Sequence, residues 1–488
     1  MSSGLAPPSL SSQSRVSASR YSVSPSSAPV QHGAISAGRV AFALILWVFG
    51  IATGGGDSLI VCLTGPVLLV VLIQLARIRS RLFTADDMVW LCVLVFFVVA
   101  PCQAVTRGVF ASWITDIVYP WTDFARATLV VLVATVSFAV VRSQLDKATV
   151  GDRPRHRSAV LLGPLSMWAL LAIAAASFAG YVQAFGGTGN VLAARNAKIA
   201  STELTGATVG FFCLGLLVAA STWLAALLRS FWHQKSALYA SVCGAILLCA
   251  LGMLGICANP FNLPRFVLLG AWLPVCLVLL GGLGRYWLVY TAALFGLLVL
   301  MPLMSLTTRE GVTGLAELSQ SDYSEDVFMI KDVDAFNTLV HSMKISDEEG
   351  YMAGKNTLAI VLFFVPRSYW PSKPIVGGLL IGGDIFKGMQ TGGTDNLSYF
   401  VGGDLYLDYG FVGVALGFAL LAAAWHSYGK YSPLVQGHDV ASPILAGSVP
   451  ILIRGPLGAV VGFFVCVVLG QVLLRMLLGR TAKKRLLQ

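Results

Sequence analysis

The sequence predicts an all-α integral membrane protein that crosses the bilayer many times. Of its 488 residues, 56% are hydrophobic and only 11% are charged, whereas a soluble domain carries about 25% charged residues. A soluble globule of this size would not have enough polar side chains to cover its surface. Apolar stretches that approach or exceed the thickness of the hydrocarbon core recur along the chain. This composition excludes a soluble enzyme, a disordered chain and a disulfide scaffold.

The two ends of the chain are polar. Residues 1–37 are rich in Ser, Ala and Pro and contain no acidic residue, and such a segment buries too little apolar surface to order itself. We therefore predict a disordered cytoplasmic tail there, and we expect no cleaved signal peptide. Residues 479–488 are predicted to form a short basic cytoplasmic tail.

About twelve segments are apolar enough to be membrane-spanning helices, which need about 20 residues to cross the hydrocarbon core. They lie near 40–55, 58–76, 87–105, 124–142, 159–183, 206–228, 236–257, 265–283, 286–304, 405–425, 439–453 and 457–477. The segment near 439–453 is the weakest, because it is short and contains two prolines. Helices one to nine then occupy residues 38–304, and helices ten to twelve occupy residues 405–478.

The distribution of charge predicts the orientation. With the N-terminus inside, the inner loops and tails carry 20 of the 33 Lys and Arg residues but only five of the 23 Asp and Glu residues. Cytoplasmic loops are enriched in basic residues in this way, so both termini are expected in the cytoplasm. The net charge of +10 is then mostly a topology signal. No clustered basic face remains for a nucleic acid.

One long segment on the outer side, residues 305–404, interrupts the series of short loops. It contains an apolar stretch at 357–365 that is only nine residues long and is followed by Pro366. Nine helical residues rise about 13 Å, less than half of the hydrocarbon core. We therefore predict a short re-entrant or interfacial helix within a long loop, and loops of this length are usually functional or disordered.

The motifs of common soluble enzymes are absent from the sequence. No GxxxxGK[ST], HExxH, GxSxG or CxxC motif occurs, and the six His residues lack the spacing of metal ligands. The nine Cys residues lie in or near apolar runs and are interpreted as small buried hydrophobes. We therefore expect no cofactor, no metal and no nucleotide-driven pump.

Four arginines on the outer side give the best functional signal, because basic residues are disfavoured there. They are Arg195, Arg265, Arg367 and Arg454. A guanidinium group binds phosphate oxygens through a planar fork, so four of them at one membrane face suit a multivalent anion such as a lipid-linked diphosphate. The alternative is that each side chain extends to lipid headgroups.

The segment 366–378, PRSYWPSKPIVGG, is the most specific stretch of the sequence. Its prolines keep the chain extended and stiff. Lys373 adds a second cation beside Arg367, and Tyr369 and Trp370 offer rings that stack on a sugar. Aromatic anchoring at the membrane interface is the alternative interpretation.

Three residues are candidates for a general base. Asp404 and Asp408 lie four residues apart, so on one helix they share a face near its outer end. Such a carboxylate accepts a proton from a sugar hydroxyl, although capping a helix or pairing with an arginine is the more common role of a single Asp. His341 is the only His on the outer side, and it titrates near neutral pH. The acidic run at 347–349 is interpreted as a solvated turn.

These features resemble the bacterial O-antigen and oligosaccharide-repeat-unit polymerases of the Wzy type. Members of this family have ten to fourteen spans, a long periplasmic loop late in the chain, and a segment close to P-R-x-x-W-P-x-K-P, which 366–374 matches here. The family's R-x10-G pattern occurs twice, from Arg195 to Gly206 and from Arg367 to Gly378. Arg265 and Arg454 resemble arginines that the family places at outer helix ends.

The resemblance implies an enzyme that polymerises repeat units carried on undecaprenyl diphosphate into O-antigen, capsule or exopolysaccharide. It would work at the periplasmic face of the bacterial inner membrane, among membrane lipids, beside a chain-length regulator and a flippase of the same pathway. Arginines would stabilise the charge on the leaving diphosphate. Two alternatives remain: a surface-polymer ligase of the same architecture, in which His341 would be functional, and a flippase for lipid-linked sugars.

Overall fold

We describe the protein from a computed structural model. The structure describes residues 29–105, 119–150, 159–192, 204–260, 263–296, 333–365, 369–375, 377–385, 397–455 and 457–485. These residues are almost entirely helical, as expected for a chain whose backbone amides and carbonyls must be satisfied within a bilayer.

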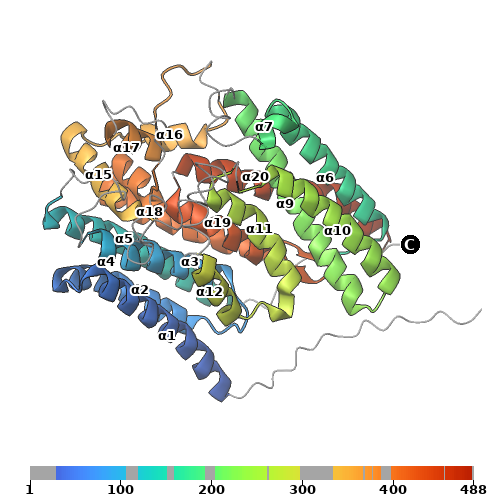
Figure 1. The fold of residues 1–488 in the computed structure, drawn as a ribbon, viewed down its shortest axis with the longest axis horizontal. Coiled ribbons are helices and arrows are strands. Elements are labelled where there is room, and N and C mark those ends of the chain that lie inside the picture. The colour runs from blue at the N-terminus through green and yellow to red at the C-terminus, as the bar shows by residue number, and fades with distance from the viewer. Residues whose placement is uncertain are drawn as a thin grey trace, which may run out of the picture.

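In the described part of the chain, nine helical segments are long and apolar enough to cross a membrane. Figure 1 shows that most of them run side by side as a bundle. They are α1 (Pro29–Gly54), α2 (Ser58–Arg77), the continuous α3 (Ala85–Leu94), η1 (Val95–Val99) and α4 (Ala100–Ala104), α5 (Trp121–Val150), α6 (Leu165–Ala184), α9 (Leu204–His233), α10 (Ala237–Cys257), α18 (Val401–Tyr431) and α20 (Leu457–Arg485).

Three shorter apolar helices coincide with the other predicted spans. They are α11 (Arg265–Leu280), α12 (Tyr286–Phe295) and α19 (Ala441–Arg454), and short η2 (Gly281–Leu283) follows α11. Each of the twelve predicted segments therefore contains a helix, and nine of these helices have the length of a full span. A polytopic α-helical membrane protein is confirmed.

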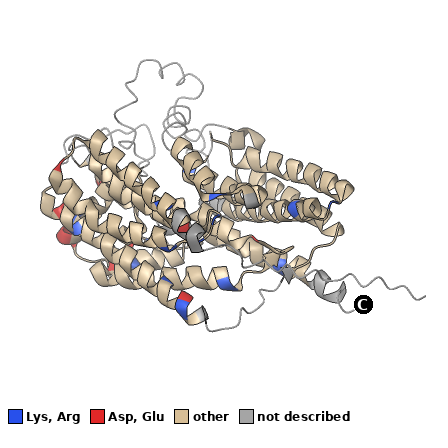
Figure 2. Cartoon of the chain, turned by 90° about the horizontal axis from the view of Figure 1, so that it is seen from below, with Lys and Arg blue, Asp and Glu red and all other residues tan. Residues whose placement is uncertain are grey.

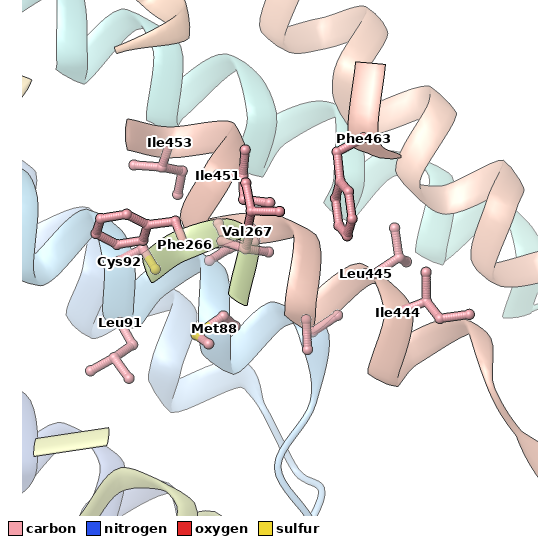
Figure 3. Packing of buried hydrophobic residues seen from close by; sticks show 14 of the residues in the cluster. Met88, Leu91, Cys92, Phe266, Val267, Ile444, Leu445, Ile451, Ile453 and Phe463 are labelled. Carbon is pink, nitrogen blue, oxygen red and sulfur yellow. The ribbon is translucent and has the colours of Figure 1, made fainter. Parts of the chain in front are cut away.

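The hydrophobic core extends through the whole bundle, and Figure 3 shows the part of it between α3, α11, α19 and α20. Gly270 of α11 faces Gly447 of α19, and a Cβ added to either glycine would lie within 3.2 Å of the other's carbonyl oxygen. Small residues allow two helices to approach this closely. Because α11 and α19 are antiparallel at this contact, the first turn of α11 lies beside the last turn of α19.

Charged side chains are sparse along the helices (Figure 2). Arg39 and Asp87 nevertheless form an ion pair in which both side chains are fully buried. Asp87 also accepts hydrogen bonds from Tyr290 Oη at 2.9 Å and from Thr84 Oγ1 at 2.7 Å. Thr84 caps α3 in return. This pair therefore joins α1, α3 and α12 at the end predicted to be cytoplasmic.

The same end carries a small sheet of two-residue strands. They are β1 (Ala159–Val160), β2 (Leu434–Val435) and β3 (His438–Asp439), in the order β1-β2-β3. Strand β1 is parallel to β2, with Ala159 opposite Leu434, and β2 is antiparallel to β3. The loop before α6 is thereby joined to the loop between α18 and α19.

The long outer segment contains more helix than the sequence predicts. Its described residues form α15 (Ala335–Glu349), α16 (Lys355–Val361) and α17 (Gly378–Ile385), which lie together at one end of the bundle (Figure 1). The short helix expected at 357–365 is α16, and it begins two residues earlier and ends four residues earlier. Neither α15 nor α17 was predicted, and the acidic run at 347–349 ends α15 instead of forming a turn.

Helices also extend into both predicted tails. Helix α1 begins at Pro29, within the segment predicted to be disordered, and α20 continues to Arg485.

The nine cysteines are free, but Cys62, Cys249 and Cys276 are exposed on the outside of the bundle rather than buried in it. In a membrane these three small apolar side chains face lipid, so the prediction of burial was wrong for them. A short helix, α7 (Thr188–Leu192), follows α6.

Candidate functional site

Helix α15 carries His341, the central residue of the candidate site, and most of the helix is buried. Phe336, Leu339, Val340 and Met343 form an apolar face that packs on α5 and α18, with spacings typical of an amphipathic helix. The hydroxyl of Thr338 donates to the carbonyl of Ser398 at 2.7 Å. The helix is therefore tied both to the bundle and to the segment that precedes α18.

An ion pair fixes the other end of α15. Arg126 of α5 donates two hydrogen bonds to the Asp347 carboxylate, at 2.7 and 3.0 Å. Both side chains are partly exposed, and exposed pairs contribute about 0–1 kcal/mol. The two-pronged geometry sets the orientation of α15 on α5 more than it adds stability.

His341 lies between these two attachments and makes hydrogen bonds through both ring nitrogens. Nε2 is 2.8 Å from Oδ2 of Asp384 on α17, and Nδ1 is 2.6 Å from the hydroxyl of Tyr119. His341 is 5% exposed and Tyr119 is 8% exposed, whereas the Asp384 side chain is 49% exposed. Neither hydrogen-bond partner of His341 was predicted from the sequence.

The partners determine the tautomer of His341. An ionised carboxylate only accepts hydrogen bonds, so Nε2 carries the proton and donates to Asp384. Nδ1 then accepts from the Tyr119 hydroxyl. Burial lowers the pKa of His341 from its ordinary 6.5, and the Asp384 hydrogen bond only partly opposes this shift. The imidazole is therefore neutral at pH 7, with a basic nitrogen at Nδ1.

Tyr119 stays protonated in this network. Burial raises the pKa of the Tyr119 phenol well above its ordinary value, and the charges of Asp334 and Asp384 add to the shift. A phenol of this kind donates a hydrogen bond and does not lose its proton. The Tyr119 hydroxyl therefore holds Nδ1 of His341 in its unprotonated form.

Asp404 and Asp408 share one face of α18, as their spacing predicts, and that face is turned toward the start of α16. Asp408 accepts from the amides of Asn356 at 3.0 Å and Thr357 at 2.6 Å, and also from the Thr357 hydroxyl. Asp404 accepts from the Asn356 side-chain amide at 2.8 Å. Both carboxylates are 1% exposed. Their geometry fits the capping role, and it favours His341 over either Asp as the base.

Helix α18 is broken directly after these two aspartates. Tyr409 and Gly410 depart from helical geometry, and Gly410 has φ of +61° and ψ of −148°. This region of the backbone is accessible essentially only to glycine. The short outer part of α18, which carries Asp404 and Asp408, therefore takes a different direction from the spanning part.

Arg265 and Arg454 lie at the same end of the bundle, at the neighbouring ends of α11 and α19. The Arg454 guanidinium stacks over the ring of Phe266, 4.2 Å from its centroid, and Phe266 is next to Arg265 in the chain. The carbonyl of Arg454 also accepts from the amide of Tyr399 at 2.6 Å. Because Ser398 binds α15, residues 397–400 connect the arginines to the helix that carries His341.

Lys373 points to the end of α16. Its ammonium donates to the carbonyls of Leu362, Phe363 and Val365, at 3.0, 3.0 and 3.1 Å. Three donors are all that a lysine has, so these contacts bind Lys373 to the residues just after α16 and leave no donor for a diphosphate. Nearby, Tyr369 is 85% exposed and Trp370 is half-buried, which leaves the Tyr369 ring open to a ligand.

The remaining predicted site residues are two arginines and two glycines. Arg195 and Arg367 lie outside the described residues, so whether all four arginines converge stays a prediction. Gly206 lies in α9 and Gly378 begins α17, the helix that carries Asp384. Among the described residues, no three His, Cys, Asp or Glu side chains are grouped as metal ligands.

The site is thus a buried imidazole held by a half-exposed carboxylate, with two guanidinium groups at the same end of a helical bundle. Comparisons with protein-family models, with curated proteins and with solved structures find no significant match to this chain.

Proposed function

We propose that the protein is a membrane-embedded glycosyltransferase that polymerises oligosaccharide repeat units carried on undecaprenyl diphosphate. The observation that carries the proposal is the His341–Asp384 pair, at the end of the bundle where Arg265 and Arg454 also lie. A basic imidazole and fixed guanidinium groups are the two elements that transfer from a sugar diphosphate needs.

The reaction assigns a role to each group. The hydroxyl of an incoming lipid-linked unit replaces the Tyr119 hydroxyl, which donates to His341 Nδ1 in this structure. It then attacks the anomeric carbon of the growing chain and gives its proton to Nδ1. The bond from that carbon to the diphosphate oxygen breaks. Asp384 stabilises the imidazolium, while Arg265 and Arg454, with Arg195 and Arg367, stabilise the charge on the leaving diphosphate.

Two lipid anchors supply a further part of the rate. Donor and acceptor both hold polyprenyl tails in the same bilayer, so the reacting groups meet at one depth without a search through solution. The exposed Tyr369 ring, near the end of α16, offers a flat surface for a sugar of either substrate.

A surface-polymer ligase is the second candidate, and the same observation favours it. A ligase moves a finished chain from its lipid diphosphate to a different acceptor, and that transfer also uses a base and cations. The two enzymes differ in the acceptor alone.

The test replaces His341 by Gln and Asp384 by Asn in a strain that lacks the chromosomal copy. A general base contributes about 10²–10⁴-fold, so we expect both variants to lose surface polymer on a gel while single units still reach the surface. Asp347→Asn is the matched control, because it removes a carboxylate from the same region that contacts Arg126 and not His341.

Other outcomes assign other functions. Long polymer that remains on its lipid identifies a ligase, and units that accumulate on the inner face identify a flippase. Normal polymer in both variants would contradict the role of the His341–Asp384 pair. Arg454→Ala and Arg367→Ala, each beside its Lys variant, then test whether a fork-shaped cation is required.

A further inference from the structure

Helices α9 and α10 leave a groove open on the outside of the bundle, near the end predicted to be cytoplasmic. Its volume is about 630 Å³, within the range of about 300–1,000 Å³ typical of ligand sites. The large side chains Leu228, Phe231 and Trp232 of α9 form one wall, and the small residues Ala240, Gly244 and Ala245 of α10 form the other. The groove is therefore mostly apolar.

One cation lies at the mouth of the groove. Lys235, in the turn between the two helices, lines it together with Ser236, and within the described residues its ammonium makes no hydrogen bond or ion pair. The first turn of α10 follows, with no acidic residue and no hydrogen bond from the Ser236 side chain to its amides. Free amides and the helix dipole add to the attraction for an anion.

The length of the groove matches one leaflet. It extends along α10 from Ala237 to Leu248, and that stretch rises about 16 Å at 1.5 Å per residue. Half of the hydrocarbon core is about 15 Å. The apolar part of the groove thus spans one leaflet, with the positive mouth at headgroup level.

We propose that this groove binds one anionic phospholipid of the cytoplasmic leaflet. The phosphate lies at Lys235 and the first turn of α10, and one acyl chain lies along the small residues of α10. The positive mouth at headgroup level complements the phosphate of a lipid, whereas the apolar spanning part of a second transmembrane helix would leave it unpaired. The inference does not depend on the proposed glycosyltransferase activity, whose site is at the opposite end of the bundle.

The experiment measures lipid binding to the full chain, purified in detergent and delipidated, by native mass spectrometry. The probes are phosphatidylglycerol and phosphatidylcholine with identical acyl chains. A contact worth about 1 kcal/mol per basic residue predicts that phosphatidylglycerol binds about fivefold more tightly or better. Lys235→Glu removes that preference, and Gly244→Leu, which fills the groove, weakens the binding of both lipids.

Matched controls leave the groove intact. Lys147→Glu reverses an exposed charge at the cytoplasmic end of α5, and Gly252→Leu adds the same side chain to an open position of α10 that does not line the groove. Both controls should bind as the unmodified protein does. If Gly244→Leu does not fold, Ala245→Leu replaces it.

Three results would overturn the proposal. The first is equal affinity of the unmodified protein for the two lipids. The second is unchanged phosphatidylglycerol binding in Lys235→Glu and in the groove-filling variant. The third is a different occupant, seen either as a polyprenyl phosphate retained through purification or as a dimer that Gly244→Leu dissociates.

Discussion

The two ends of the bundle differ in how far their buried charged groups are shielded from solvent. At the end predicted to be cytoplasmic, Arg39 and Asp87 are completely enclosed, and Tyr290 and Thr84 complete the contacts of the carboxylate. At the other end, His341 is buried but its partner Asp384 is half-exposed. One cluster is closed to solvent on every side, whereas the other reaches the surface through its carboxylate.

This difference separates a structural role from a chemical one. A group that exchanges protons with a substrate needs a path to that substrate, and the enclosed pair has none in the described structure. Breaking a buried ion pair leaves a charge in a medium of low polarity, so enclosure makes the pair a determinant of stability.

Arg39→Ala should have the largest effect on stability. The substitution leaves the Asp87 carboxylate buried without its partner, at a cost of about 3–5 kcal/mol. Thermal unfolding in detergent should show a strongly lowered Tm. The double variant Arg39→Met with Asp87→Leu should recover most of the loss, because no buried charge then remains. Arg81→Ala, at an exposed position of the same end, is the control with little effect.

Asp408→Ala should cost about 1–3 kcal/mol, the penalty for leaving buried donors unsatisfied. The amides of Asn356 and Thr357 would lose their acceptor at the start of α16. Hydrogen exchange should then increase in α16 but not in α15. Asp408 is enclosed, but it lies at the same end as His341. If the variant lost activity without any loss of hydrogen-exchange protection in α16, enclosure would not identify Asp408 as a structural residue.

The stability of the protein should depend on pH through His341. Burial lowers the pKa of His341 in the folded state below its ordinary 6.5, so below pH 6.5 the unfolded chain binds a proton that the folded chain resists. Stability is therefore complete above pH 6.5 and falls below it, by at most about 1.4 kcal/mol per pH unit between the two pKa values. Comparing Tm at pH 5 and pH 7.5 should show this loss in the unmodified protein and a smaller one in His341→Gln.

Lys373→Met should have the smallest effect, about 0.3–1 kcal/mol. It removes the ammonium that binds the carbonyls just after α16 but keeps most of the length of the side chain. Polymer synthesis in the complemented strain should remain close to normal. A complete loss of polymer with an unchanged Tm would return Lys373 to the group of diphosphate ligands.

The spans were predictable from sequence because the constraint that produces them is local. About 20 apolar residues must follow one another to cross the hydrocarbon core, and the hydropathy of the sequence shows such runs directly. The shared face of Asp404 and Asp408 was predictable for the same reason, since it needs only helical periodicity.

Helix α15 was missed although the signal was present. Phe336, Leu339, Val340 and Met343 repeat at helical spacing. An amphipathic helix has no continuous apolar run, however, so hydropathy does not detect it. The break at Gly410 was missed because a glycine in an apolar run fits an ordinary helix as well as a bend.

Local sequence patterns do not predict which distant residues come together in the site. Tyr119 and His341 are 222 residues apart, and Arg39 and Asp87 are 48 residues apart. Periodicity says which face a side chain occupies but not which helix lies opposite. Residues 397–400 join α15 to Arg454, but no pattern in their sequence predicts the contact with Thr338 or the contact with Arg454.

The distance along the chain between Arg39 and Asp87 has a consequence for biosynthesis. Synthesis proceeds from the N-terminus, so α1 leaves the ribosome before the carboxylate that neutralises it has been made. Until α3 arrives, the Arg39 guanidinium has to remain among water and lipid phosphates at the bilayer edge, where arginine is tolerated. We therefore expect α1 to reach its final depth, and its topology to become permanent, only when α3 is in place.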